Sequence, residues 1–140
     1  MKQLILFDVD GTILYPGTLA RQLMNEVVAG FTGRSPDLKI EDVAGFTDPI
    51  IIRNALKKVQ FGRANLASAV ETVLGEYVGR LKKEYPTYDQ PYLYEDAVEL
   101  IRECRGAGWR MGLLTGNLRE GAEIKLDRFN IWDKFDFGVF

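Results

Sequence analysis

Residues 4–12 read Leu-Ile-Leu-Phe-Asp-Val-Asp-Gly-Thr. The four apolar residues at its start are typical of a short strand that is buried on both faces, as in a parallel sheet. The run stops at two carboxylates, Asp8 and Asp10, and Gly11 then allows the chain to turn tightly. Because ligand sites of open α/β sheets lie beyond the carboxyl ends of the strands, this stretch predicts a functional loop on a parallel sheet.

After this loop the pattern becomes helical. Apolar residues recur at helical spacing within residues 19–31, 51–59 and 66–81, and Asp48 followed by Pro49 predicts the start of the second of these helices. A linker, residues 85–93, precedes a helix over 97–104, a strand over 109–114, a helix over 122–129 and a third strand over 135–140. This order predicts an α/β fold: a parallel sheet of about three strands, interrupted by a helical domain. We place the sheet domain at 1–14 and 93–140, and the helical domain at 15–92.

Composition excludes several classes of function. The net charge of −2 gives no electrostatic basis for nucleic-acid binding, and the absence of histidine excludes serine–histidine and cysteine–histidine catalysis. The single cysteine, Cys104, cannot form an internal disulfide, and no apolar run is long enough for a signal peptide or a membrane span. We therefore expect a cytoplasmic protein without a membrane partner.

A second polar segment, Leu114-Thr115-Gly116-Asn117, ends the predicted strand over 109–114. Since carboxyl ends of parallel strands meet at one edge of a sheet, we expect it to converge with the first loop. Phosphoryl transfer to a carboxylate requires a nucleophile and a group that protonates the leaving oxygen, roles that suit Asp8 and Asp10. The hydroxyl of Thr115 is a further candidate catalytic group. The candidate substrate-binding residues of the two loops are Gly11, Thr12, Gly116 and Asn117.

Each segment also has a purely structural interpretation. A carboxylate pair at a strand end is usually a turn followed by a helix cap, and Thr-Gly-Asn alone is more often just a turn. The presence of both segments, each at the end of a predicted strand, favours the functional interpretation.

Residues 4–12 and 113–117 resemble the first two motifs of the haloacid dehalogenase-like (HAD) superfamily. Residues 45–49, Gly-Phe-Thr-Asp-Pro, resemble the substrate-facing loop in the helical cap of phosphoglycolate-phosphatase-like members. The resemblance implies a Rossmann-like core with an inserted α-helical cap. It also implies a magnesium ion held by the Asp8 carboxylate and the Asp10 backbone carbonyl. Thr47 and Arg53, near the cap loop, are candidates for binding the anionic end of a substrate.

Two family features differ in this chain. A third motif supplies a lysine or arginine that steadies the phosphorylated aspartate; Lys125 is the candidate, against the alternative of a solvated lysine on an amphipathic helix. A fourth, acidic motif follows the next strand and is absent from the 140 residues. We therefore expect a fragment of a longer protein, with an unpaired apolar edge at residues 4–7 and with a dimeric or strand-swapped state if it is stable alone.

The expected function is magnesium-dependent hydrolysis of a phosphomonoester on a small phosphorylated metabolite, through an aspartyl-phosphate. Three alternatives remain at this point. One is a sugar phosphomutase, and another is an inactive fragment that serves as a binding or regulatory module. A phospho-accepting receiver domain also places aspartates after its first strand, but the long insertion straight after the motif argues against it.

Overall fold

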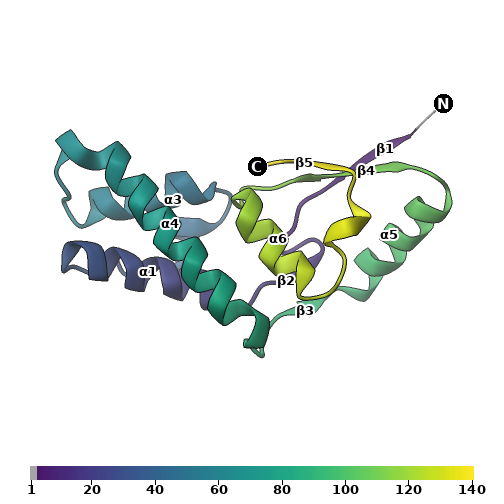
Figure 1. The fold of residues 1–140 in the computed structure, drawn as a ribbon, viewed down its shortest axis with the longest axis horizontal. Helices are drawn as coiled ribbons and strands as arrows, with labels where there is room; N and C mark the ends of the chain where they lie inside the picture. Colours follow the sequence, from purple (N-terminus) through teal and green to yellow (C-terminus); the bar gives the residue numbers. More distant parts are fainter. Residues whose placement is uncertain (1–2) are drawn as a thin grey trace. The chain divides into compact units, whose positions relative to one another are not determined.

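The computed structural model describes residues 3–140. Its three-stranded parallel sheet contains β1 (Leu4–Phe7), β4 (Arg110–Leu114) and β5 (Phe137–Val139), in the order β1-β4-β5 (Figure 1). The predicted α/β fold is therefore confirmed, with β5 shorter than the expected strand over 135–140. β1 lies at one edge of the sheet, as predicted.

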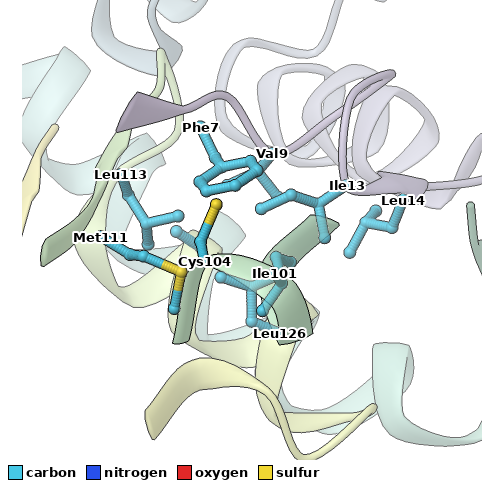
Figure 2. Close-up of a cluster of buried hydrophobic side chains, with 10 residues drawn as sticks. Phe7, Val9, Ile13, Leu14, Ile101, Cys104, Met111, Leu113 and Leu126 are labelled. Carbon is cyan, nitrogen blue, oxygen red and sulfur yellow. The ribbon is translucent and has the colours of Figure 1, made fainter. Parts of the chain in front are cut away.

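One face of the sheet carries the hydrophobic core. Phe7 of β1 pairs with Leu113 of β4, and both pack against α5 (Glu95–Gly106) and α6 (Arg119–Asp127) (Figure 2). The fully buried members of this core include Val9, Ile13, Leu14, Met111 and Leu126. The loop after β1 is therefore held in place because its Val9 and Ile13 side chains are buried in the same core as residues of α5 and α6.

The opposite face of the sheet is largely uncovered. Leu4 and Leu6 of β1 are 58% and 46% exposed, and Leu114 and Val139, which are register partners, are about half exposed. Parallel sheets usually carry helices on both faces. Among residues 3–140, β1 is both the edge strand of the sheet and part of this uncovered face.

A two-stranded antiparallel sheet, which the sequence did not predict, joins the segments on either side of the helical part. It pairs β2 (Leu14–Tyr15) with β3 (Tyr92–Leu93), and the rings of Tyr15 and Tyr92 lie 5.2 Å apart. Strands of two residues leave no alternating pattern to detect, and residues 85–93 read as a linker for that reason.

The helical part of the chain consists of α1 (Leu19–Thr32), α2 (Ile40–Val43), α3 (Asp48–Lys58), the 3-10 helix η1 (Arg63–Asn65) and α4 (Leu66–Glu84). The three long helices bury the apolar stripes expected from their spacing, including Leu23, Ile52, Leu56, Val73 and Leu81. α3 begins at Asp48, as predicted, with Thr47 as its N-cap and Pro49 in its first turn. Within residues 3–140, no helix has the length and apolarity that a bilayer span requires.

The chain forms two compact units. One comprises the residues up to Gly17 together with Tyr85–Phe140 and holds both sheets; the other is Thr18–Glu84, which we call the helical unit. The sequence placed these boundaries at 14/15 and 92/93. Residues 15–17 and 85–92 thus belong with the strands, because the β2–β3 pairing ties them there.

Candidate active site

Asp8 is the first residue beyond β1. Its side chain is exposed, and its Oδ1 accepts a hydrogen bond from the backbone N–H of Val9 at 2.8 Å. Val9 is fully buried, so the chain alternates a solvent-facing carboxylate with a core side chain at the end of the strand. This alternation fixes the direction in which the Asp8 carboxylate leaves the sheet.

Asp10 is held by a tight turn that starts at Gly11. Gly11 has a φ of +79° and donates to the carbonyl of Leu14 at 2.8 Å, while Thr12 and Ile13 both donate to the carbonyl of Val9. A positive φ favours glycine, so the predicted role of Gly11 in the turn is confirmed. The turn leaves the side chain of Asp10 36% exposed.

Thr115 and Asn117 form the loop after β4. The backbone N–H of Thr115 donates to Val139 of β5 at 3.2 Å, which ties the loop to the sheet. The Thr115 hydroxyl accepts hydrogen bonds from the backbone N–H of Asn117 at 3.2 Å and from its side-chain Nδ2 at 2.8 Å. Both side chains are buried, so the loop is internally fixed.

Lys125 of α6 joins the two loops. Its ammonium group donates to Asp10 Oδ2 and to Asn117 Oδ1, both at 2.6 Å, and Asn117 Nδ2 donates to the same Asp10 oxygen at 3.1 Å. The side chain of Lys125 is only 2% exposed, so the alternative of a solvated lysine is wrong. The two predicted loops therefore meet, as the strand topology required.

The donor set suits a magnesium ion. Mg²⁺ prefers oxygen ligands and is usually held by one or two carboxylates, with water and substrate phosphate in the other positions. The exposed Asp8 carboxylate and the backbone carbonyl of Asp10, two residues further along the chain, are such oxygens. Among residues 3–140, no three His, Cys, Asp or Glu side chains lie close enough together to hold a metal ion.

The other predicted site residues take no part in the hydrogen bonds of this network. Thr12 is exposed and Gly116 half-buried, each in its expected loop. Thr47 is the N-cap of α3 and Arg53 is exposed on the same helix, both within the helical unit. Their predicted contact with a substrate stays a prediction.

One residue of this region was missed from the sequence. Tyr85 read as part of a linker, but it is fully buried in the same compact unit as Asp10. The available signal was spacing, since Tyr85 follows Leu81 by four residues and so continues the apolar stripe of the preceding helix.

Comparison with known proteins agrees with the fold. A phosphoglycolate phosphatase of Cereibacter sphaeroides is 25% identical over 135 residues, which cover 94% of this chain and 59% of the relative. The crystal structure of CbbY from Rhodobacter sphaeroides in complex with phosphate matches with a TM-score of 0.72 at 23% identity, covering 99% of this chain and 63% of that one. A CbbY mutant in complex with xylulose-(1,5)-bisphosphate matches similarly, with a TM-score of 0.71.

The chain thus spans about three fifths of the length of these relatives. The family model for haloacid dehalogenase-like hydrolases matches residues 2–140, nearly the whole chain. Together with the parallel sheet and the two converging loops, this match shows that the chain belongs to the haloacid dehalogenase-like hydrolase family.

Proposed function

We propose that the protein is a magnesium-dependent phosphatase that hydrolyses a small phosphorylated metabolite through an aspartyl-phosphate on Asp8. The observation that carries this proposal is the network in which Lys125 and Asn117 hold Asp10, two residues from the exposed Asp8 carboxylate. The phosphatase names of the relatives support the same class of reaction.

In the first step a carboxylate oxygen of Asp8 attacks phosphorus, and the bond between phosphorus and the ester oxygen breaks. Asp10 gives its proton to the departing oxygen, which leaves as an alcohol. In the second step Asp10, now ionised, takes a proton from a water molecule that attacks the same phosphorus. The bond between phosphorus and the Asp8 oxygen breaks and inorganic phosphate leaves. Asp8 is again a free carboxylate, and Asp10 carries the proton taken from water, as it did at the start of the reaction.

The proposed reaction requires a correctly oriented Asp10 carboxyl group, and this orientation is the role of Lys125, Asn117 and Thr115. Lys125 and Asn117 hold one oxygen of Asp10 in place, which limits the rotation of its carboxyl group. The Thr115 hydroxyl keeps the Asn117 side chain aligned for that purpose. Such preorganisation matters because proton transfer requires the acid and the reacting oxygen within hydrogen-bond reach.

Magnesium would be held by the Asp8 carboxylate and the Asp10 backbone carbonyl. When bound, it supplies positive charge that offsets the charge on the phosphoryl oxygens. The exposed position of Asp8 leaves its carboxylate accessible to both the ion and the phosphate.

The helical unit is proposed to act as a cap that recognises the rest of the substrate. Its candidates are Thr47, the N-cap of α3, whose hydroxyl can bind an anionic group, and Arg53, exposed in the middle of the same helix, whose guanidinium can do the same. We expect Arg53→Ala to raise KM for an anionic substrate and to leave kcat nearly unchanged. Arg63→Ala, in η1 of the same unit, is the matched control.

A binding module without catalysis is the second candidate. It is favoured by the partial magnesium ligand set, because Asp8 and Asp10 are joined by no third acidic side chain among the described residues. Such a module would bind phosphate analogues at the same loops and release no product.

Release of inorganic phosphate tests the proposal. Purified protein is incubated with p-nitrophenyl phosphate, phosphoglycolate or a hexose phosphate, with magnesium or with EDTA. We expect magnesium-dependent release that Asp8→Asn abolishes, and product analysis on hexose phosphate separates hydrolysis from transfer within a mutase. Binding of phosphate analogues without any release would favour the binding module instead.

A further inference from the structure

Tyr85 occupies an unusual position for an aromatic residue. It is the first residue after α4 and begins the 3-10 helix η2 (Tyr85–Thr87), at the boundary between the two compact units. Its side chain is 0% exposed, and among the described residues its hydroxyl has no hydrogen-bond partner. Buried hydroxyl groups are normally satisfied, so this one requires an explanation.

Arg128 fixes Tyr85 against the end of α6. Its Nη1 donates to the Tyr85 carbonyl at 2.6 Å, and its guanidinium carbon lies 5.7 Å from the centroid of the Tyr85 ring. Since α6 also carries Lys125, the helix that holds Asp10 is the same helix against which Tyr85 is packed.

Asp10 provides the complementary group. Its Oδ2 accepts from Lys125 and Asn117, whereas its Oδ1 is buried and has no hydrogen-bond partner among the described residues. Burial raises the pKa of the Tyr85 phenol, and the negative charge of Asp10 raises it further, while Arg128 acts in the opposite direction. The compact unit that contains both residues thus holds a buried hydroxyl without an acceptor, on Tyr85, and a buried carboxylate oxygen without a donor, Asp10 Oδ1.

We infer that Tyr85 is a positioning residue for Asp10. Its hydroxyl donates to Asp10 Oδ1, directly after a small shift of the side chain or through one bridging water. The carboxyl group is then held on both oxygens, while 36% of its surface remains accessible to a substrate. The catalytic meaning of this contact rests on the proposed phosphatase function, but the contact itself can be tested without it.

A double-mutant cycle on thermal unfolding tests the contact. Tyr85→Phe removes only the hydroxyl, so we expect the unfolding midpoint to fall by about 2–5 °C. In the Asp10→Ala background Tyr85→Phe should not lower the unfolding midpoint, because the carboxylate that accepts from the Tyr85 hydroxyl is absent. Equal shifts in the two backgrounds would overturn the inference. Tyr77→Phe, at a fully buried tyrosine of the helical unit, is the control and should give equal shifts.

If Asp10→Ala fails to fold, the contact is tested with Asp10→Asn instead. The measurement is then NMR of protein labelled with ¹³C at tyrosine Cζ. The Tyr85 resonance, assigned with Tyr85→Phe, should move in Asp10→Asn, whereas the Tyr77 resonance should not. An unchanged Tyr85 resonance would contradict a hydrogen bond between the two side chains.

Kinetics then test the positioning role. We expect Tyr85→Phe to lower kcat roughly three- to tenfold with KM unchanged, a small part of the 10²–10⁴-fold that a placed acid–base group contributes. Full kcat in Tyr85→Phe would refute the role. If Tyr85 and Asp10 are coupled in the double-mutant cycle but the protein releases no phosphate, only the proposed phosphatase function is contradicted. If the protein is active but the two residues are not coupled, only this inference is contradicted.

Discussion

The ammonium group of Lys125 lies 2.6 Å from a carboxylate oxygen of Asp10, although 115 positions separate the two residues in the chain. The parallel pairing of β1 with β4 brings their loops to one edge of the sheet. Lys125, on α6, then contacts a residue of each loop. The ion pair is thus a product of the fold rather than of local sequence. It makes the stability of the sheet unit depend on the same residues as the proposed chemistry.

Replacement of Lys125 by methionine should destabilise the protein. The change leaves Asp10 Oδ2 and Asn117 Oδ1 without their principal donor, and loss of one partner from a buried pair is costly. Because Asp10 is partly exposed, we expect a loss of about 1–3 kcal/mol in the free energy of unfolding, measured by urea denaturation. Lys82→Met, at an exposed position of α4, should change it by less than about 0.5 kcal/mol. Equal losses in the two variants would contradict the buried pair.

Two glycines with positive φ should respond differently to alanine. At Gly11 (φ +79°) an added methyl group would meet open space, whereas a Cβ at Gly17 (φ +72°) would lie 2.5 Å from a ring carbon of Tyr88. Both variants carry the backbone strain of about 1–2 kcal/mol. Gly17→Ala should lose about 1–3 kcal/mol more, because Tyr88 must shift. Similar losses in thermal or urea unfolding would argue against the close approach of residues 17 and 88.

The carboxyl group of Asp136 should make stability depend on pH. The backbone N–H of Met111 donates to it at 2.9 Å and, with the nearby Arg105, holds the pKa of Asp136 below its usual range. Since the folded-state pKa is depressed, the stabilisation is complete above the unfolded value of about 3.9 and is lost as the pH falls through the folded value.

The stability difference between wild type and Asp136→Asn should therefore be constant from about pH 7 to pH 5 and should shrink below about pH 4. Urea denaturation at several pH values measures this difference. A gap that widens on acidification would have the wrong sign for a depressed pKa.

The exposed edge at β1 predicts self-association. Leu4 and Leu6 are exposed on β1, which within residues 3–140 pairs with β4 alone, and such edges add strands from other molecules. We expect a dimer or larger species in size-exclusion chromatography with light scattering, shifted toward monomer by Leu6→Glu. Ile40→Glu, an exposed apolar position of the helical unit, should leave the distribution unchanged. A monomeric wild type whose β1 amides resist hydrogen exchange would be inconsistent with an open edge.

The predictable part of the fold was set by long or strongly marked segments. β1 was readable because an apolar run stops at two carboxylates, and the helices over Leu19–Thr32 and Leu66–Glu84 because their apolar stripes extend over several turns. The β2–β3 pair was not, since two-residue strands have no period and depend on a partner about eighty residues away.

The two loops of the site could be predicted from the sequence, whereas the burial of Lys125 between them could not. Lys125 follows Ala122 by three residues and precedes Leu126, so helical spacing placed it beside the buried stripe of α6. Sequence could not show that Asp10 and Asn117 would meet it there, because that contact depends on two loops and their sheet. Tyr85 was missed for the same reason, since its burial is set by packing against Arg128 and α6.

In the proposed reaction Asp8 receives a phosphoryl group beside Asp10 and Lys125. Fluorine NMR with beryllofluoride, which mimics a phosphoryl group on a carboxylate, tests this claim most directly. We predict magnesium-dependent resonances of bound beryllofluoride in the wild type and in Asp10→Asn, and none in Asp8→Asn. Bound resonances that persist in Asp8→Asn, or that are missing from a folded wild-type protein with magnesium, would contradict the account.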